Sequence, residues 1–130
     1  MDRNLSDEDI RPITIVVVED ELILRMIAVN FLTDAGFLVI EVSHAAGAIE
    51  LLEVQFMDVH VLFTDIHMPG LMDGLALAHH VKKNWPHIGL LVTSGDGSPS
   101  LADLPEGSRF LKKPYKHAHV ISHVRNLKAA

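Results

Sequence analysis

The chain has 130 residues, of which 48% are hydrophobic and 22% charged, with a net charge of −6. This composition indicates one globular domain and excludes a chain that is disordered throughout. The absence of cysteine excludes disulfide scaffolds, thiolate zinc sites and cysteine nucleophiles. No aliphatic run is long enough to span a membrane, and the acidic first ten residues do not resemble a secretory signal, so we expect a soluble cytoplasmic domain.

The first third of the chain predicts an arm, a strand and a helix. Residues 1–12 are polar and predict an arm outside the fold. The β-branched run 13–18 is typical of a strand that is buried on both faces of a parallel sheet, and three carboxylates follow it. Apolar side chains recur at helical spacing over 21–35, and Gly36 is a typical helix end.

Two more strands and two more helices are predicted in the middle of the chain. Residues 37–42 form the second strand, and Ser43 can cap a helix that continues to residue 53. The side chains of this helix that we expect to face inward are Ile49, Leu52 and Val54. A third buried strand over 59–64 ends at Asp65. After a loop rich in proline and glycine, a helix over 75–85 ends at Pro86.

The last third predicts two strands joined by a segment that cannot form a full helix. Residues 88–92 form the fourth strand. Residues 94–108 contain three glycines and two prolines, so we expect at most a short turn around 101–104. A short fifth strand over 109–112 and a helix over 115–127 complete an alternating pattern. This alternation predicts a parallel sheet with helices on both faces.

Polar residues interrupt the apolar runs where the predicted strands end. In open α/β sheets, ligands bind at the carboxyl ends of the strands. The residues at these ends are Glu19 and Asp20, Asp65, Thr93 and Ser94, and Lys113. Asp20 and Asp65 can supply oxygen ligands to Mg²⁺, with Glu19 joining directly or through water. Lys113 and Thr93 can hold phosphoryl oxygens, so the set suits phosphoryl transfer.

Five pieces of sequence strengthen this interpretation. They are VVVEDE (16–21), LFTDIHMPG (62–70), DG (73–74), LLVTSG (90–95) and FLKKPY (110–115). Together they resemble the receiver domain of bacterial two-component response regulators, in the family's order and at roughly its spacing. The resemblance implies a flavodoxin-like, doubly wound α/β fold in residues 13–130. Its five-stranded parallel sheet would have the order 2-1-3-4-5, with helices on both faces and a short or degenerate fourth helix.

The resemblance also implies roles for the residues at the strand ends. Asp65 matches the aspartate that accepts a phosphoryl group from a histidine kinase or a histidine phosphotransfer protein. Glu19 and Asp20 match the acidic pair that binds Mg²⁺, together with Asp65 and the backbone carbonyl of His67. Thr93 matches the hydroxyl residue that engages the phosphoryl group and moves on activation.

The remaining matches concern the end of the fifth strand and its neighbours. Lys113 matches the lysine that pairs with the phosphoryl group, and its peptide bond to Pro114 is often cis in the family. Ser94 is expected to help bind the phosphoryl group. Phe110 occupies the position of the family's aromatic switch residue.

The sequence departs from the family pattern in three places. Glu19 replaces the commoner aspartate, a variant that the family tolerates. The loop sequence GLMDG is one residue longer than usual, near Leu71 and Met72. The degenerate fourth helix predicts a reshaped signalling face and argues against the standard mode of dimerisation.

The function predicted from these residues is that of a stand-alone phosphoacceptor. We expect Mg²⁺-dependent phosphorylation on Asp65, with self-catalysed phosphotransfer and autodephosphorylation rather than metabolic catalysis. Because the chain stops near residue 130, we expect output through a downstream protein, with a weak dimer as an option and no binding to nucleic acid or membrane.

Two alternatives use the same site differently. One is a receiver-like binding module that signals without phosphorylation. The intact set of site residues argues against this alternative. The other is a Mg²⁺-dependent aspartyl-phosphate phosphohydrolase, which usually needs a second acid where His67 stands.

The basic end of the chain and its histidines leave further alternatives. All 17 acidic residues and 5 of the 11 basic residues lie in 1–106, a net charge of −12, whereas 107–130 carry +6. This end could bind nucleic acid or an acidic partner, or be a solvated face; beside the degenerate helix, we favour a protein-binding face. His119 and His123 have the spacing of zinc ligands, but they lack a third ligand at matching spacing.

Overall fold

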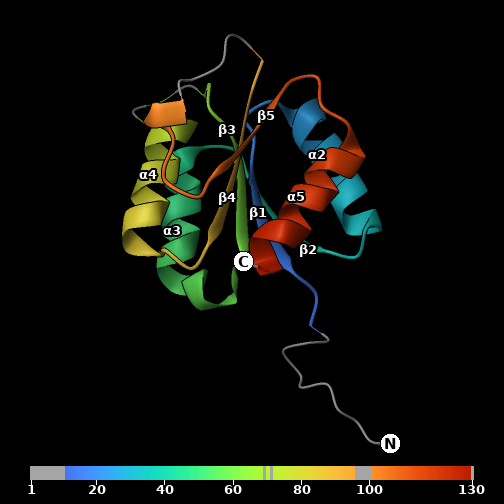
Figure 1. Cartoon of the computed structure of the whole chain (residues 1–130), viewed down its shortest axis with the longest axis horizontal. Helices are drawn as coiled ribbons and strands as arrows, with labels where there is room; N and C mark the ends of the chain where they lie inside the picture. Colours follow the sequence, from blue (N-terminus) through green and yellow to red (C-terminus); the bar gives the residue numbers. More distant parts are fainter. Residues whose placement is uncertain (1–10, 69, 71, 96–100, 130) are drawn as a thin grey trace, which may run out of the picture.

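The computed structural model describes residues 11–68, 70, 72–95 and 101–129. Five parallel strands form one sheet in the order β2-β1-β3-β4-β5 (Figure 1). The strands are β1 (Thr14–Val18), β2 (Leu38–Val42), β3 (Val61–Asp65), β4 (Gly89–Ser94) and β5 (Arg109–Lys112). The predicted fold class and strand order are confirmed.

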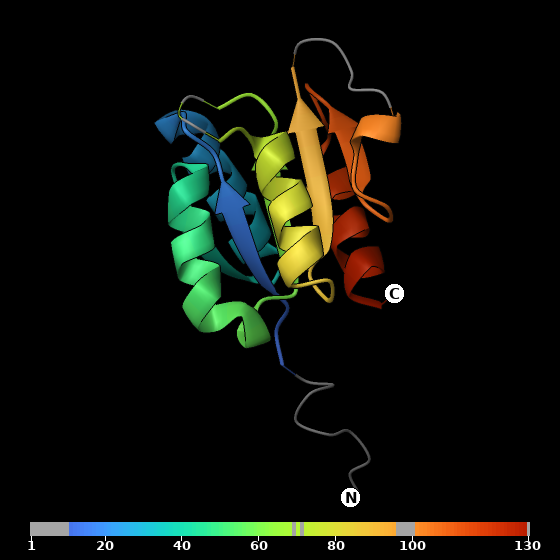
Figure 2. The same ribbon diagram turned by 90° about the vertical axis from the view of Figure 1, so that its left-hand side faces the viewer.

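Helices cover both faces of the sheet. They are α2 (Leu22–Asp34), α3 (Ala45–Gln55), α4 (Gly74–Asn84) and α5 (His117–Ala129). Helices α3 and α4 lie on one face, which is turned to the viewer in Figure 2, and α2 and α5 lie on the other. The longest of these helices have 13 residues, and none in the described part of the chain could traverse a lipid bilayer.

The core consists of two apolar layers, one on each face of the sheet. Val16 and Leu62 point toward α3 and α4, whereas Ile15 and Phe63 point toward α2 and α5. All five residues of β1 and of β3 are buried. These two strands therefore bury both faces, as their continuous β-branched and apolar runs predict.

The connection between β4 and β5 contains little helix, as expected. Its described part contains only the 3₁₀ helix η2 (Leu101–Asp103), and residues 96–100 lie outside the described part. Most of the predicted arm, residues 1–12, also lies outside it, as does Leu71 in the lengthened loop. The short turn predicted around 101–104 is confirmed.

Two details predicted for α3 are wrong. The residue that caps the helix is His44 rather than Ser43, because the His44 Nδ1 accepts a hydrogen bond of 2.9 Å from the Gly47 N–H. Val54 is 81% exposed instead of facing inward. The buried side of α3 is formed by Ala45, Ala48 and Leu52. Two residues beyond Leu52 the helix has turned by about 200°, which points Val54 away from the core.

This difference between two neighbouring positions of α3 can be measured. We expect Leu52→Ala to lower the free energy of unfolding by about 2–5 kcal/mol, because Leu52 is fully buried. We expect Val54→Ala to change it by less than about 0.5 kcal/mol. Urea unfolding followed by circular dichroism would measure both, and equal losses would contradict the orientation of the helix.

Candidate functional site

Three carboxylates lie at the carboxyl edge of the sheet. Glu19 and Asp20 follow β1, and Asp65 is the last residue of β3. Because β1 pairs directly with β3, with Val18 opposite Thr64, the residues after these strands lie side by side. Glu19 and Asp65 are each only 7% exposed. Two buried carboxylates therefore lie close together, where they need a compensating charge.

Lys113, the residue after β5, supplies that charge. Its Nζ lies 2.5 Å from the Asp65 Oδ2 and 3.5 Å from the Glu19 Oε1. The Lys113 N–H donates to the Ser94 carbonyl at 2.9 Å, which ties the end of β5 to β4. The peptide bond between Lys113 and Pro114 is cis, as the resemblance implies. One ammonium group thus bridges the ends of β1 and β3.

The charges of this cluster influence each other. Burial raises the pKa of Glu19, and the negative charge of Asp65 raises it further, while Lys113 opposes the rise. Burial alone lowers the pKa of Lys113, but the hydrogen bond to Asp65 and the charge of Glu19 raise it above its usual value. Lys113 therefore remains positively charged at neutral pH and serves as a fixed counter-charge for both carboxylates.

The carboxylate of Asp65 is held at both oxygens. Its Oδ1 accepts a hydrogen bond of 3.0 Å from the His67 N–H, while Oδ2 faces Lys113. The Thr64 hydroxyl donates to the Asp65 backbone carbonyl at 3.0 Å. The two contacts at its oxygens give the carboxylate one orientation.

Thr93 and Ser94 are the last two residues of β4, and both are buried. Thr93 lies opposite Asp65 in the β3–β4 pairing, and its carbonyl accepts from the Ile66 N–H at 2.8 Å. The Thr93 Oγ1 is buried and has no hydrogen-bond partner among the described residues. It lines a small cavity together with Glu19 and Asp65. A buried hydroxyl without a partner is free to donate a hydrogen bond to an oxygen atom of a ligand.

The remaining predicted site residues are Asp20, His67 and Phe110. Asp20 is half-buried, and its side chain is close enough to Glu19 to raise the pKa of Glu19 further. His67 is exposed and contacts Asp65 through its backbone. Phe110 is half-buried and packs on the core layer under α3 and α4. Its predicted role as a switch stays a prediction.

The donor set suits a hard divalent cation. Glu19, Asp20 and Asp65 offer carboxylate oxygens and His67 a backbone carbonyl, and Mg²⁺ is usually held by one or two carboxylates with several waters. Among the described residues, no group of three or more His, Asp or Glu side chains is arranged to hold a metal ion.

The structural reason for the DG motif could not be read from the sequence. The Asp73 carboxylate caps α4 by accepting from the Ala76 N–H at 2.8 Å. The Gly74 N–H donates to the Ile66 carbonyl at 2.8 Å, and a Cβ at Gly74 would lie 1.7 Å from the Asp65 backbone oxygen. Only glycine lets the start of α4 approach the end of β3 so closely.

Arg25 is a further residue at the site that was not predicted from the sequence. Its guanidinium donates to the Glu19 carbonyl at 2.8 Å and pairs with the Glu41 carboxylate at 3.1 Å. It thereby joins α2, the end of β1 and β2 next to the site. The sequence did contain a signal for this role, because Arg25 is the only lysine or arginine between residues 12 and 81.

Comparisons with known proteins agree on one family. The family model described as the response regulator receiver domain matches residues 15–125. The response regulator receiver protein CpdR of Brucella abortus is 28% identical over 87% of this chain and 94% of that protein. The crystal structure of a response regulator receiver protein from Sinorhizobium medicae has a TM-score of 0.85 at 33% identity, covering 92% of this chain and 96% of that one.

Some curated relatives are much longer than this chain. The sensor kinase CckA of Brucella abortus is 31% identical over 117 residues, which are 88% of this chain and 12% of that protein. The two-component response regulator ARR21 of Arabidopsis thaliana matches over 18% of its length. These matches concern one domain within larger proteins.

The close approach at Gly74 yields a prediction about stability. We expect Gly74→Ala to lower the free energy of unfolding by about 1–3 kcal/mol, because the added methyl group collides with the Asp65 backbone. The control is Gly95→Ala, whose Cβ would meet only the Lys113 side chain at 3.7 Å. Thermal unfolding would measure both, and a Gly74→Ala protein as stable as the wild type would contradict the packing.

The hydroxyl groups of Thr93 and Thr64 provide a matched pair. We expect Thr93→Val to leave the free energy of unfolding unchanged or to raise it by up to about 1 kcal/mol, because a buried group without a partner is removed. Thr64→Val should lower it by about 1 kcal/mol, because that hydroxyl donates a hydrogen bond. Chemical denaturation distinguishes them, and an equal loss for both variants would show that Thr93 has a partner.

Proposed function

Because the chain belongs to the family of response regulator receiver domains, we propose that it is a phosphoacceptor of two-component signalling that is phosphorylated on Asp65. The observation that carries the proposal is the contact of Lys113 with both Asp65 and Glu19 at the carboxyl edge of the sheet. A buried nucleophilic carboxylate beside a fixed cation is the arrangement that phosphoryl transfer requires.

The proposed reaction transfers a phosphoryl group between two residues. A carboxylate oxygen of Asp65 attacks the phosphorus of a phosphohistidine, so an O–P bond forms, the N–P bond breaks, and the imidazole leaves with its electron pair. Lys113 offsets the negative charge that accumulates on the phosphoryl oxygens. The Thr93 hydroxyl, which is buried beside Asp65, donates to one of these oxygens, with Ser94 adjacent.

Mg²⁺ is the cofactor that this proposal includes. Glu19, Asp20 and Asp65 would hold it through carboxylate oxygens, with the His67 carbonyl as a further ligand. When bound, it neutralises negative charge on the phosphoryl oxygens during transfer. Arg25 holds the Glu19 backbone, so it positions one of these ligands.

The phosphodonor would be a histidine kinase or a histidine phosphotransfer protein. A hollow of about 350 Å³ lies beside Lys113 and is lined partly by Leu24, Ile27, Pro114 and Tyr115. On α2, Leu22, Ile23 and Met26 are also exposed. Exposed apolar side chains that border a polar site are typical of a protein docking surface, so we infer that the donor approaches over α2.

Phosphorylation would reach a downstream protein through the end of the sheet. Thr93 and Phe110 lie on the neighbouring strands β4 and β5, and Phe110 is next to the opposite partner of Thr93, Leu111. A shift of Thr93 toward a phosphoryl group would therefore displace the neighbouring part of β5, which includes Phe110. The receiver unit proposed here is residues 13–130; the cytoplasmic location and the weak dimer stay predictions.

Phosphorylation by acetyl phosphate tests the proposal directly. With Mg²⁺ present, we expect the wild type to gain one acid-stable, hydroxylamine-labile phosphoryl group, seen by intact-protein mass spectrometry. Asp65→Asn should gain none, and the control Asp58→Asn, an exposed aspartate in the 3₁₀ helix η1 (Phe56–Asp58), should behave as the wild type. Lys113→Met and Thr93→Val should each slow phosphorylation by about tenfold or more.

Two results would contradict the proposal. If Asp65→Asn is labelled like the wild type, the phosphoacceptor is another residue. If the folded wild type gains no phosphoryl group from acetyl phosphate or from any histidine kinase, and does not bind beryllofluoride, the chain is a receiver-like module that works without phosphorylation.

A further inference from the structure

Glu19 is held at its backbone by two neighbouring elements. Its N–H donates to the Val42 carbonyl at the end of β2, at 3.2 Å. Its carbonyl accepts a hydrogen bond of 2.8 Å from the guanidinium of Arg25, near the start of α2. The side chain is held as well, because Oε2 accepts from the Glu21 N–H at 3.1 Å and Oε1 faces Lys113. Every polar group of Glu19 therefore has a partner.

The hydrogen bond from Arg25 acts on the peptide unit that joins Glu19 to Asp20. Because a peptide unit is planar, the direction of the Glu19 carbonyl also fixes the direction of the Asp20 N–H and the place of the Asp20 Cα. These two residues carry the adjacent carboxylates of the proposed Mg²⁺ site. Arg25 thus constrains the backbone that carries both side chains, while its ion pair within the described ranges is with Glu41.

Glu41 holds the guanidinium of Arg25 in place. Its Oε1 accepts from the Arg25 Nε at 3.1 Å, so the planar guanidinium donates in two directions, to Glu41 and to the Glu19 carbonyl. Glu41 lies on β2, the edge strand of the sheet, and its side chain is 50% exposed. A chain of contacts therefore runs from an exposed residue at the edge of the sheet to the proposed metal ligands.

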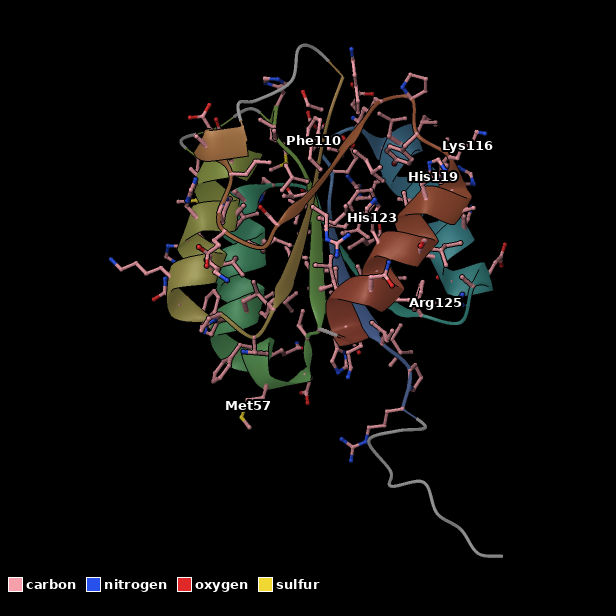
Figure 3. All side chains as sticks on the ribbon, viewed as in Figure 1. Met57, Phe110, Lys116, His119, His123 and Arg125 are labelled. Carbon is pink, nitrogen blue, oxygen red and sulfur yellow. The ribbon has the colours of Figure 1, made fainter. Side chains whose placement is uncertain are left out.

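Arg25 differs from the cations near α5, the helix that shares its face of the sheet. Lys116, just before α5, and Arg125, within it, lie at the surface (Figure 3), and neither forms an ion pair in the part of the chain that the structure describes. Arg25 is the only lysine or arginine of α2, and its side chain is 16% exposed. It is a cation with two hydrogen-bonded partners next to the site.

The charge of Arg25 gives no reason for its place beside a metal site. A guanidinium near Glu19 and Asp20 attracts their carboxylates but repels a divalent cation that they bind. If charge decided, removal of Arg25 would tighten metal binding. If the position of the peptide between Glu19 and Asp20 decided, removal of Arg25 would weaken it. The two contributions have opposite signs, so an experiment can separate them.

We propose that Arg25 and Glu41 are positioning residues of the Mg²⁺ site. Glu41 holds the guanidinium of Arg25, and Arg25 holds the peptide unit between Glu19 and Asp20, so that the two carboxylates are oriented before the metal ion binds. Because this role concerns the Mg²⁺ site, it rests on the proposed function. The affinity for the metal then depends on two residues that do not bind it themselves.

Direct metal binding tests the role of Arg25. The probe is Mn²⁺, because the electron paramagnetic resonance signal of free Mn²⁺ measures how much is bound, and competition by Mg²⁺ gives the affinity for Mg²⁺. Arg25→Met removes the donors and the charge, and we expect it to weaken the binding of both ions by about tenfold, as the loss of outer-shell partners does. Arg25→Lys keeps the charge and a donor and should restore part of the affinity.

Two variants of Glu41 separate position from charge at the other end of the chain of contacts. Glu41→Gln removes the charge but keeps an oxygen that accepts from Arg25, so the affinity should fall by less than about twofold. Glu41→Ala removes the acceptor as well and should weaken binding by about threefold to fivefold. In the Arg25→Met background, Glu41→Ala should change the affinity by less than about twofold, because the contact is already absent.

The control is Glu53→Ala, which removes an exposed carboxylate in the last turn of α3 and should bind Mn²⁺ like the wild type. Circular dichroism checks that each variant is folded. Phosphorylation by acetyl phosphate adds a second readout. In Arg25→Met, the Mg²⁺ concentration that gives half of the maximal rate should rise by about tenfold. A merely structural role would lower the folded fraction and leave this concentration unchanged.

Two results would overturn the positioning role and leave the proposed function intact. One is a wild type that binds Mn²⁺ and is labelled on Asp65, together with an Arg25→Met variant that binds Mn²⁺ as tightly or more tightly. The other is an equal loss of affinity in Glu41→Gln and Glu41→Ala, and these two variants alone decide if Arg25→Met does not fold. A folded wild type that binds neither ion would overturn the metal-dependent part of the proposed function and the positioning role with it.

Discussion

The ammonium group of Lys113 is the interaction on which the site depends. It lies against two buried carboxylates that would otherwise repel each other, Glu19 and Asp65. These partners are 94 and 48 residues away from Lys113 in the sequence. The contact therefore exists only if β1, β3 and β5 all lie in one sheet with their carboxyl ends at the same edge. The strand order found here satisfies that condition.

The two-layered core makes this edge rigid. Because β1 and β3 are buried on both faces, their ends cannot shift without disturbing packing on both sides. The contact at Gly74 adds a second constraint, since it places the start of α4 against the Asp65 backbone. Keeping the buried carboxylates of Glu19 and Asp65 in place costs free energy. Apolar burial elsewhere in the fold offsets this cost, as is common for functional sites.

Charge is distributed unevenly over the molecule. The acidic residues at the sheet edge concentrate negative charge where a cation and a phosphoryl group would bind, and Lys113 balances part of it. The other cations near the end of the chain lie on β5 and α5, facing outward. The count of +6 for residues 107–130 therefore combines one charge within the site and five exposed charges outside it. The sequence does not reveal which of these charges belongs to the site, because Lys112 and Lys113 are neighbours in the chain.

The sequence alone determined the features that depend on local physics. The β-branched run before Glu19 indicated a strand buried on both faces, the glycines and prolines of 94–108 excluded a full helix, and the polar strand ends indicated the site. The tertiary structure decided which neighbour each side chain meets: Val54 points outward, His44 rather than Ser43 caps α3, and Arg25 reaches the Glu19 carbonyl. Periodicity limits the face that a helix buries but not its rotation against the sheet, because that rotation depends on contacts between residues far apart in the chain.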